Sequence, residues 1–567
     1  MDGATFDLIK PWAKEGKLPT LNRFLDEGVH GELKSTFPPL TAAAWTSFMS
    51  GKNPGKHALY DFIEPKSDSY EVRYTNARSR LTTSIWQILS EYGLRVGIIN
   101  VPMTYPPEPV NGYVISGLDA PEGNGTITFP PGLHCELEKM FGKVSPSVRY
   151  LGYLKTDERR EKVLRLLSEM DEHYLKMAQY LMKRDPVDLM MLVLTSTDST
   201  QHFFWHYMDR NHPHHNPHKS TRFGNAILKA YQRADGIIER LTVELPEETT
   251  VILMSDHGFR PTSGRIVYLN RFLQELGLLK LRGQKSRRFC PGVLFDQLIK
   301  SGDLFLRSTL SPRQKERVAQ LFPVLRNKWE SHNSGLSNID WEHTKAYCYE
   351  MVTCPSGIWV NLNGARPQGI VQPGPEYDDL LRFITQKLYE LRDPLTGTQL
   401  VTKVYRKDEI YTGPYLDRAP DLTVAWWEGI TFVGKPSFSG QHRNGGESKV
   451  VEYIGEDPLA SGEWTGNHAV NGILLMKGKD LRGGARLNGA EIIDVAPTLL
   501  YLLGVPGFEA MDGRVLTEAF KDEYLQSHGF DVQSSGVAGY TEFSDQTYSD
   551  AESILVAQRL RDLGYLE

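Results

Sequence analysis

The sequence predicts an α/β protein built on a doubly wound, mostly parallel sheet flanked by helices. Four short apolar runs end abruptly in small polar or acidic residues, as strands buried on both faces of a parallel sheet do. These runs are Arg95–Val101, Leu189–Thr195, Thr249–Met254 and Gly472–Met476. Stretches with helical periodicity alternate with them. A chain of 567 residues is long enough for one large domain of this kind with insertions.

Two helices illustrate the alternation. Pro19 and Gly28 bracket the first, which carries Leu21, Phe24 and Leu25 on a single face. The second spans about Glu161 to Lys183, where apolar residues recur in helical register. Both segments therefore present an apolar face that the sheet can cover.

The chain divides into four regions by composition. Residues 1–270 form the first part of the core, and 344–528 form its second part with a small α/β subdomain. Between them, 271–343 is rich in Leu, Lys and Arg and predicts a mostly helical insertion or cap. Residues 529–567 read as an extended tail that ends in a short amphipathic helix at Ala551–Leu563.

Composition excludes several functional classes. The 64 basic and 70 acidic residues give a net charge of -6, which offers no global field for a nucleic-acid polymer or an anionic membrane. Four cysteines are too few for a disulfide scaffold. No apolar run is long enough to span a membrane, and the first ten residues do not resemble a signal peptide. These features predict a soluble, cytoplasmic protein; its oligomeric state stays open.

Acidic and histidine side chains follow two of the predicted strands. Asp198 comes soon after Leu189–Thr195, and His202 lies four residues later, on the same side of a helix. Asp256 and His257 follow Thr249–Met254 directly. Because loops at the carboxyl edge of a parallel sheet converge on one crevice, these side chains are expected to meet there.

A third histidine, His468, precedes the run Gly472–Met476. Oxygen and nitrogen ligands together suit Zn²⁺ or Mn²⁺ better than Ca²⁺. Taken singly, such an Asp is more often a helix cap and such a His a structural residue. His202 and His206 are also four apart, so they offer an alternative pair of ligands. The other histidines up to His218 predict a solvated loop rather than metal storage.

Thr41 is the candidate nucleophile. It follows two prolines and precedes an Ala-rich run closed by Gly51, so it stands at the start of a predicted helix. The free N–H groups and the positive end of a helix favour a phosphoryl oxygen there. From this segment alone, Thr41 is equally well explained as a helix N-cap.

Six segments together resemble the alkaline phosphatase superfamily, and most closely its type I phosphodiesterase/nucleotide pyrophosphatase branch and the related microbial phosphohydrolases or phosphomutases. They are DGATFDLI at Asp2, FPPLTAAAWTSFMSGKNPGKH at Phe37, TSTDSTQH at Thr195, SDHGF at Ser255, GNHAVNGILLMKG at Gly466 and DVAPTLLYLLGVP at Asp494. The resemblance runs in order from Asp2 to about Leu516.

This resemblance implies two divalent metal ions, zinc or less often manganese. It assigns one ion to Asp198, His202 and His468. It assigns the other to Asp2, Asp256 and His257, with Thr41 bridging toward the phosphate. A separation of more than about 10 Å between Asp198 and His468 would rule out a shared site, because zinc ligands lie about 2 Å from the metal.

Two positions depart from the family pattern. The nucleotide pyrophosphatases carry an Asn three residues after the nucleophile, where this chain has Ala44. In the superfamily, the first Asp ligand also follows an apolar strand in the middle of the sheet, whereas only Met1 precedes Asp2 here. A start further upstream, a loosely positioned Asp2 and weaker metal binding at the second site are therefore expected. The segment around Thr41 contains no Cys-x-Pro-x-Arg motif, which argues against the sulfatase branch.

The leading hypothesis is a metal-dependent phosphoric ester hydrolase that acts on a small phosphodiester or nucleotide-like substrate through a phosphothreonine intermediate. One alternative is a phosphomutase, which would use the same metals and return the phosphoryl group to another oxygen of its substrate. Another is a non-catalytic protein that binds metal or a phosphorylated ligand.

Overall fold

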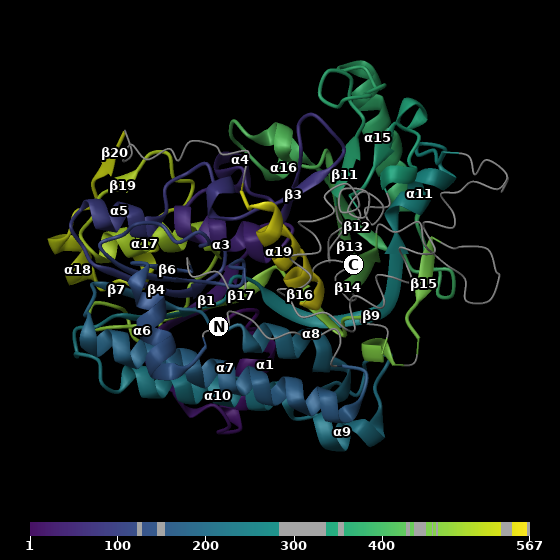
Figure 1. Ribbon diagram of the computed structural model, residues 1–567. Helices are drawn as coiled ribbons and strands as arrows, with labels where there is room; N and C mark the ends of the chain where they lie inside the picture. Colours follow the sequence, from purple (N-terminus) through teal and green to yellow (C-terminus); the bar gives the residue numbers. More distant parts are fainter. Residues whose placement is uncertain are drawn as a thin grey trace.

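Two four-stranded sheets form the centre of the molecule in the computed structural model (Figure 1). The structure describes residues 1–121, 127–143, 154–282, 336–349, 357–426, 431–435, 450–455, 457–460, 463–534 and 547–563. The first sheet has the order β18 (Ala490–Glu491), β1 (Val29–Lys34), β17 (Asn471–Lys477) and β8 (Val251–Met254). The second has the order β6 (Thr128–Phe129), β5 (Gly112–Ser116), β4 (Val96–Val101) and β7 (Leu189–Leu192).

The α/β class is confirmed, but the mostly parallel sheet is not. Strands β4, β5 and β7 run parallel. In contrast, β17 is antiparallel to both of its neighbours, β1 and β8. An apolar run shows that a strand is buried without showing its direction, which is why the pattern misled here. The four predicted strands all exist, as β4, β7, β8 and β17.

The two sheets meet edge to edge, with β7 at the edge of one sheet and β8 at the edge of the other. Within the described ranges no strand pairs with both of them, and their apolar side chains are mostly half-buried rather than buried on both faces. The start of the chain joins their ends. The Met1 amino group donates to Met254 O at 2.9 Å, and the Asp2 N–H donates to Leu194 O at 3.0 Å. Hydrogen bonds that alternate between two neighbours in this way are those of a middle strand.

An apolar segment of five or six residues added ahead of Met1 should therefore pair with both strand edges and raise the melting temperature by a few degrees. It would also replace the Met1 amino group, whose pKa burial lowers, with an uncharged amide. Thermal melting of the extended chain beside one with a Gly/Ser extension of equal length makes the comparison. Equal melting temperatures would show that the edges accept no further strand.

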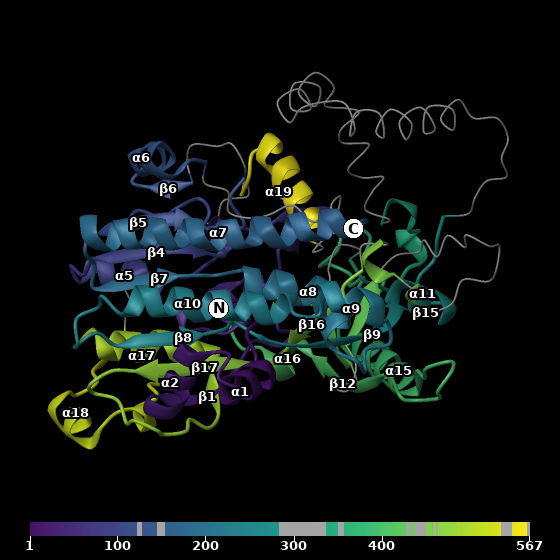
Figure 2. The same ribbon diagram turned by 90° about the horizontal axis from the view of Figure 1, so that it is seen from below.

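Helices cover both faces of the paired sheets (Figure 1). On one face lie α7 (Asp157–Arg184), α8 (Ser196–Met208) and α10 (Ala226–Thr242), and on the other lie α3 (Thr41–Ser50), α5 (Ile85–Glu91) and α17 (Val495–Leu502). The chain begins with α1 (Phe6–Lys14) and α2 (Pro19–Glu27), which lie beside β1 and β17 (Figure 2). The predicted helices thus exist as α2, which Gly28 caps, and α7.

A third sheet extends away from the centre and supports the site. Its long strand β9 (Gly258–Tyr268) follows β8 directly and pairs with β14 (Thr431–Lys435), β15 (Val451–Tyr453) and β16 (Gly466–Ala469). Beyond it lies a sheet of β10 (Ala346–Tyr347), β11 (Gly357–Val360), β13 (Leu422–Trp426) and β12 (Val401–Arg406), accompanied by α15 (Pro375–Glu390). Most of the predicted helical insertion at 271–343 lies outside the described residues.

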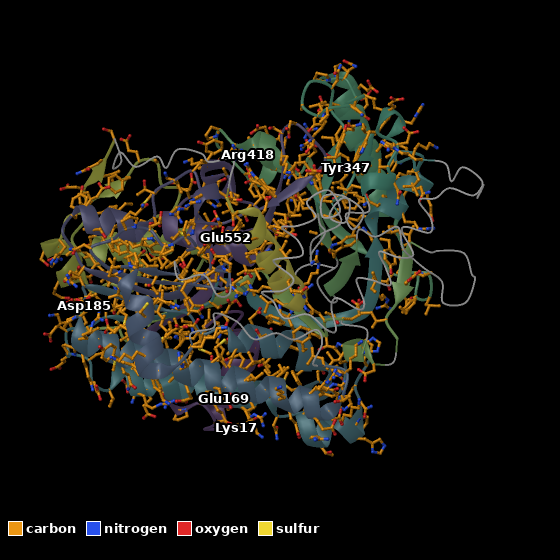
Figure 3. All side chains as sticks on the ribbon, viewed as in Figure 1. Lys17, Glu169, Asp185, Tyr347, Arg418 and Glu552 are labelled. Carbon is orange, nitrogen blue, oxygen red and sulfur yellow. The ribbon has the colours of Figure 1, made fainter. Side chains whose placement is uncertain are left out.

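The C-terminal helix α19 (Asp550–Asp562) is confirmed close to its predicted bounds. Tyr548, just before it, stacks on Tyr105 and donates a hydrogen bond to Asp119 O at 2.9 Å. Glu552 accepts a hydrogen bond from the Tyr105 hydroxyl and lies near the middle of the molecule in Figure 3. The end of the chain is therefore fixed to the loops that follow β4 and β5.

The remaining α-helices and strands of the described residues are short. They are α4 (Pro54–His57), α6 (Gly132–Phe141), α9 (Pro217–Phe223), α11 (Leu269–Glu275), α16 (Lys407–Ile410), α18 (Asp522–Ser527), β2 (Ile63–Pro65), β3 (Val72–Tyr74), β19 (Gly507–Phe508) and β20 (Val532–Gln533). Among the described residues, no helix combines the length and the apolar character needed to cross a membrane.

Candidate metal centre

The fold brings four distant segments to one place. Helix α8 follows β7 and carries Asp198 and His202. Asp256 and His257 lie between β8 and β9, and Asp2 lies ahead of α1. Because β17 is antiparallel to β8, its first residues lie at the carboxyl end of β8, and β16 places His468 opposite Phe259 of β9. The antiparallel direction that the sequence did not predict is what brings this third histidine to the site.

The first group of side chains consists of Asp198, His202 and His468. The Asp198 Oδ1 atom lies 3.3 Å from His202 Nε2 and 3.4 Å from His468 Nε2. The two Nε2 atoms are 3.1 Å apart. The predicted meeting of Asp198 with His468 is therefore confirmed, although 270 residues separate them in the sequence. One aspartate oxygen and two imidazole nitrogens converge on a point, as zinc ligands do.

The second group lies directly beside the first. His257 Nε2 is 3.3 Å from Asp256 Oδ2 and 3.7 Å from Asp2 Oδ1. It is also 4.0 Å from Asp198 Oδ1. Ligand atoms of Asp2, Asp198 and His257 all lie within 4.8 Å of one another. Asp198 thus belongs to both groups, whereas the resemblance assigned it to one.

The chemistry of these atoms fits divalent metal ions. All six residues are buried, with at most 6% of the surface of any of these residues exposed. Four of their polar atoms, among them the converging Asp2 Oδ1, Asp198 Oδ1 and His257 Nε2, have no hydrogen-bond partner within the described residues. Buried polar atoms without partners are costly. A shared cation would satisfy several of them at once.

Each histidine is oriented by a backbone carbonyl. His202 Nδ1 is 2.9 Å from Gly466 O, His257 Nδ1 is 3.0 Å from Gly258 O, and His468 Nδ1 is 2.8 Å from Pro39 O. A carbonyl accepts only, so Nδ1 carries the proton and Nε2 keeps its lone pair. All three lone pairs therefore face the two groups, which is the arrangement that metal-binding histidines use.

Burial sets the charge of this region. Burial raises the pKa of Asp2 well above its ordinary value, and the charges of Asp256 and Asp198 raise it further. Burial lowers the pKa of His202, and it lowers the pKa of His257 to about 4. Burial acts in the opposite direction on Asp198, but the neighbouring His202 and His468 hold its pKa below the ordinary value. At neutral pH the imidazoles of His202 and His257 are thus uncharged and able to bind a metal.

Thr41 lies at the start of α3 and is buried. Pro39, two residues earlier, accepts the hydrogen bond from His468, and Ser35 donates to Asp256 O at 2.5 Å. The loop before α3 therefore runs along both groups. The N-cap of α3 is Leu40, so Thr41 is the first helical residue and the capping interpretation is wrong. Gly51 closes the helix with φ 66°, as predicted.

A buried serine and histidine connect α3 to the next turn of the chain. The Leu59 N–H donates to His57 Nδ1 at 3.2 Å, so the proton is on Nε2, which donates to Ser47 Oγ at 2.9 Å. Burial lowers the pKa of His57 to about 3. His57 is therefore an uncharged residue that stabilises α3, the helix that carries Thr41, through its hydrogen bond to Ser47, rather than a base.

His57 should make stability depend on acidity. An unfolded histidine protonates near pH 6.5, so its contribution is fully present above that pH and falls by about 1.4 kcal/mol per unit as the pH drops toward 3. Thermal melting from pH 7.5 to 4.5 checks this, with His57→Gln, which keeps a donor toward Ser47, as the comparison. The variant should show a shallower acid slope, and an identical slope would contradict the assignment.

The histidine-rich stretch matches the expected solvated loop only in part, since His218 is exposed and His214 and His215 are half-buried. His206 and His212 are buried, and their rings lie 6.0 Å apart. His212 Nε2 is 3.0 Å from Thr465 O, and His214 N–H donates to His212 Nδ1. The loop is thus packed on the segment before β16. His206 belongs to neither group of ligand atoms, so the alternative pair of His202 with His206 finds no support.

Two residues that sequence reasoning missed stand next to the ligands. Thr197 and Gln201 of α8 are buried and have the same spacing of four as Asp198 and His202. The signal was available, because a buried polar pair beside a ligand pair on a helix needs partners. Ala44, by contrast, is buried within α3 and offers only a methyl group at the position where the family carries Asn.

Similar folds occur among solved structures. Human ectonucleotide pyrophosphatase/phosphodiesterase 5 is 13% identical, with 88% of this chain and 93% of that chain covered and a TM-score of 0.44. The inactive murine protein of the same name, in complex with AMP, is 14% identical. The match covers 93% of this chain and 97% of that chain, with a TM-score of 0.46. Phosphonoacetate hydrolase from Sinorhizobium meliloti, in complex with phosphonoacetate, is 12% identical. The match covers 87% of this chain and 92% of that chain, with a TM-score of 0.46. Curated protein sequences yield no match.

The sequence itself decides the family. The model of the type I phosphodiesterase/nucleotide pyrophosphatase family matches residues 1–448. This range contains Thr41 and every ligand candidate except His468, which follows it. The match covers well over half of the chain and agrees with the resemblance carried by the motifs. The chain belongs to the type I phosphodiesterase/nucleotide pyrophosphatase family, a family of phosphoester hydrolases.

Proposed function

We propose that the protein hydrolyses a small phosphodiester or nucleotide-like substrate, with two divalent metal ions and Thr41 as the nucleophile. The observation that carries this proposal is the convergence of buried ligand atoms from four segments beside the start of α3. Neither a structural core nor a simple binding pocket needs three carboxylates and three oriented imidazoles in one place. The net charge of -6 favours a small substrate over a nucleic-acid polymer.

The ligand sets follow from the two groups. Asp198, His202 and His468 would hold one ion, and Asp2, Asp256 and His257 the other, with Asp198 within reach of both. Zinc suits this mixture of oxygen and nitrogen, and manganese is the second choice. Bound there, the ions would supply positive charge that lowers the pKa of a hydroxyl or water and stabilises charge on the phosphoryl oxygens.

The protein's own part in the reaction centres on α3. The first N–H groups of a helix lack acceptors within it and favour an anionic phosphoryl group. Thr41 Oγ1 would form a bond to phosphorus while the bond from phosphorus to the leaving oxygen breaks, and that oxygen departs with a proton. Water then attacks the phosphothreonine, the bond from Oγ1 to phosphorus breaks, and Oγ1 recovers a proton. The net result is hydrolysis of one ester bond.

A parallel substrate screen tests the proposal. The zinc-loaded protein is assayed with bis-p-nitrophenyl phosphate, p-nitrophenyl phosphate and a nucleoside 5'-p-nitrophenyl phosphate. We expect release of nitrophenolate from the diesters at a higher kcat/KM than from the monoester. Faster turnover of the monoester would overturn the substrate class, and metal retention without turnover of any substrate would overturn the catalytic role.

A further inference from the structure

Helix α8 presents two neighbouring stripes of buried polar side chains. Asp198 and His202 form the stripe that faces the metal centre. Thr197 and Gln201, each one residue earlier, form the second, and both are fully buried. Residues four apart lie one above the other on a helix, so the two stripes run side by side with the same spacing. A segment that is hydrogen-bonded to Thr197 and Gln201 is therefore held at a fixed position relative to Asp198 and His202.

The second stripe holds the backbone around Asp2. Thr197 Oγ1 donates to Asp2 O at 2.6 Å, and Gln201 Nε2 donates to Gly3 O at 2.9 Å. Gln201 is itself oriented, because its Oε1 accepts a hydrogen bond from the Tyr231 hydroxyl at 3.1 Å. That hydroxyl accepts in turn from the Thr5 N–H at 3.1 Å. The start of the chain thus lies against α8 through a closed set of hydrogen bonds (Figure 2).

Two further backbone groups of this segment are also hydrogen-bonded. Gly3 N–H donates to Asp256 Oδ1 at 3.3 Å, and Ser255 Oγ donates to Ala4 O at 2.9 Å. Gly3 has φ 61°, and a Cβ atom there would lie 2.9 Å from Phe259 Cδ2. The expectation of a loosely positioned Asp2 is therefore wrong for its backbone, since these hydrogen bonds hold the backbone of Asp2 and Gly3 in place.

The geometry points to Thr197 and Gln201 as positioning residues that fix the Asp2 carboxylate for the second metal ion at a set distance from the first. This inference rests on the proposed two-metal function. The imidazoles of the first group have other partners, because His202 Nδ1 donates to Gly466 O and His468 Nδ1 donates to Pro39 O. Loss of the hydrogen bonds from Thr197 and Gln201 should therefore lower the affinity for the second ion and leave the affinity for the first ion unchanged.

Zinc titration of matched variants tests the inference. Thr197→Val keeps the shape of the side chain and removes the hydroxyl, whereas Thr197→Ser keeps the hydroxyl. Gln201→Met removes the amide at similar length. Calorimetry of the metal-free proteins with Zn²⁺ should resolve two sites in the wild type. We expect Thr197→Val and Gln201→Met each to weaken one site about 10- to 100-fold and to leave the other within about threefold, with Thr197→Ser close to the wild type.

Three outcomes would overturn the inference. They are equal weakening of both sites, unchanged affinities in both variants, and a Thr197→Ser variant as weak as Thr197→Val. Circular dichroism of the metal-free variants identifies one that fails to fold, and the other variant then decides. A wild type that binds no zinc would instead refute the two-metal function itself, so the two failures are distinguishable.

Discussion

Replacing Thr41 with alanine should lower turnover by at least about 10³-fold while the metal content of the protein stays nearly unchanged. The hydroxyl is expected to act as the nucleophile, whereas three carboxylates and three imidazoles are available as metal ligands. Thr41→Ser retains a hydroxyl and should recover much of the rate. The measurements are diester hydrolysis and metal analysis of the same preparations.

A second threonine of α3 provides the control. Thr46 is also buried, and its hydroxyl donates to Ala42 O at 2.7 Å within the helix. Thr46→Ala removes the same atoms without touching the site, so it should retain activity. Acid quenching during turnover should trap a phosphoryl group on wild-type protein and none on Thr41→Ala. A Thr41→Ala variant that kept most of the rate would instead favour direct attack by water without a covalent intermediate.

The site was more predictable than the sheet that carries it. Asp198, Asp256 and His257 could be placed because each follows an apolar strand, and strand ends gather at one edge. His468 could be singled out as a candidate from the sequence, but it was assigned to the first ion only through the resemblance, since its approach depends on β17 running antiparallel to β8. The composition of a strand indicates that it is buried, whereas its direction depends on how the rest of the chain connects the strands.

Other features were beyond the sequence because they depend on tertiary contacts. The half-burial of β7 and β8 follows from their position at facing sheet edges. His212 is buried because the segment before β16 packs on it, which no local pattern records. The firm hold on Asp2 comes from α8 and Tyr231, more than 190 residues away. A hydrogen bond between such distant residues leaves no periodic trace in the chain.

Replacing His468 with glutamine should weaken the first metal site by more than about 100-fold and abolish turnover. The substitution removes one of three converging ligand atoms, and it also removes the hydrogen bond to Pro39 O that connects the site to the loop before Thr41. Because a bound ion stabilises the folded state by RT ln(1 + [L]/Kd), zinc at about 1,000 times its Kd should stabilise the wild type by about 4 kcal/mol. This gain applies to each site, so a first site weakened more than about 100-fold should lose about 3 kcal/mol of it while the contribution of the second site remains.

His206→Gln is the matched control for this second prediction. His206 is another buried histidine of α8, but its ring packs on Tyr207 and His212, outside both groups of ligand atoms. Its replacement should lower the melting temperature of the metal-free protein while the rise produced by zinc stays as in the wild type. Melting curves with and without zinc, taken on wild type and both variants, separate a lost ligand from a damaged core. If His468→Gln kept the full zinc-dependent rise and His206→Gln lost it, the metal would be held by the His202 and His206 pair, and the first ligand set would be wrong.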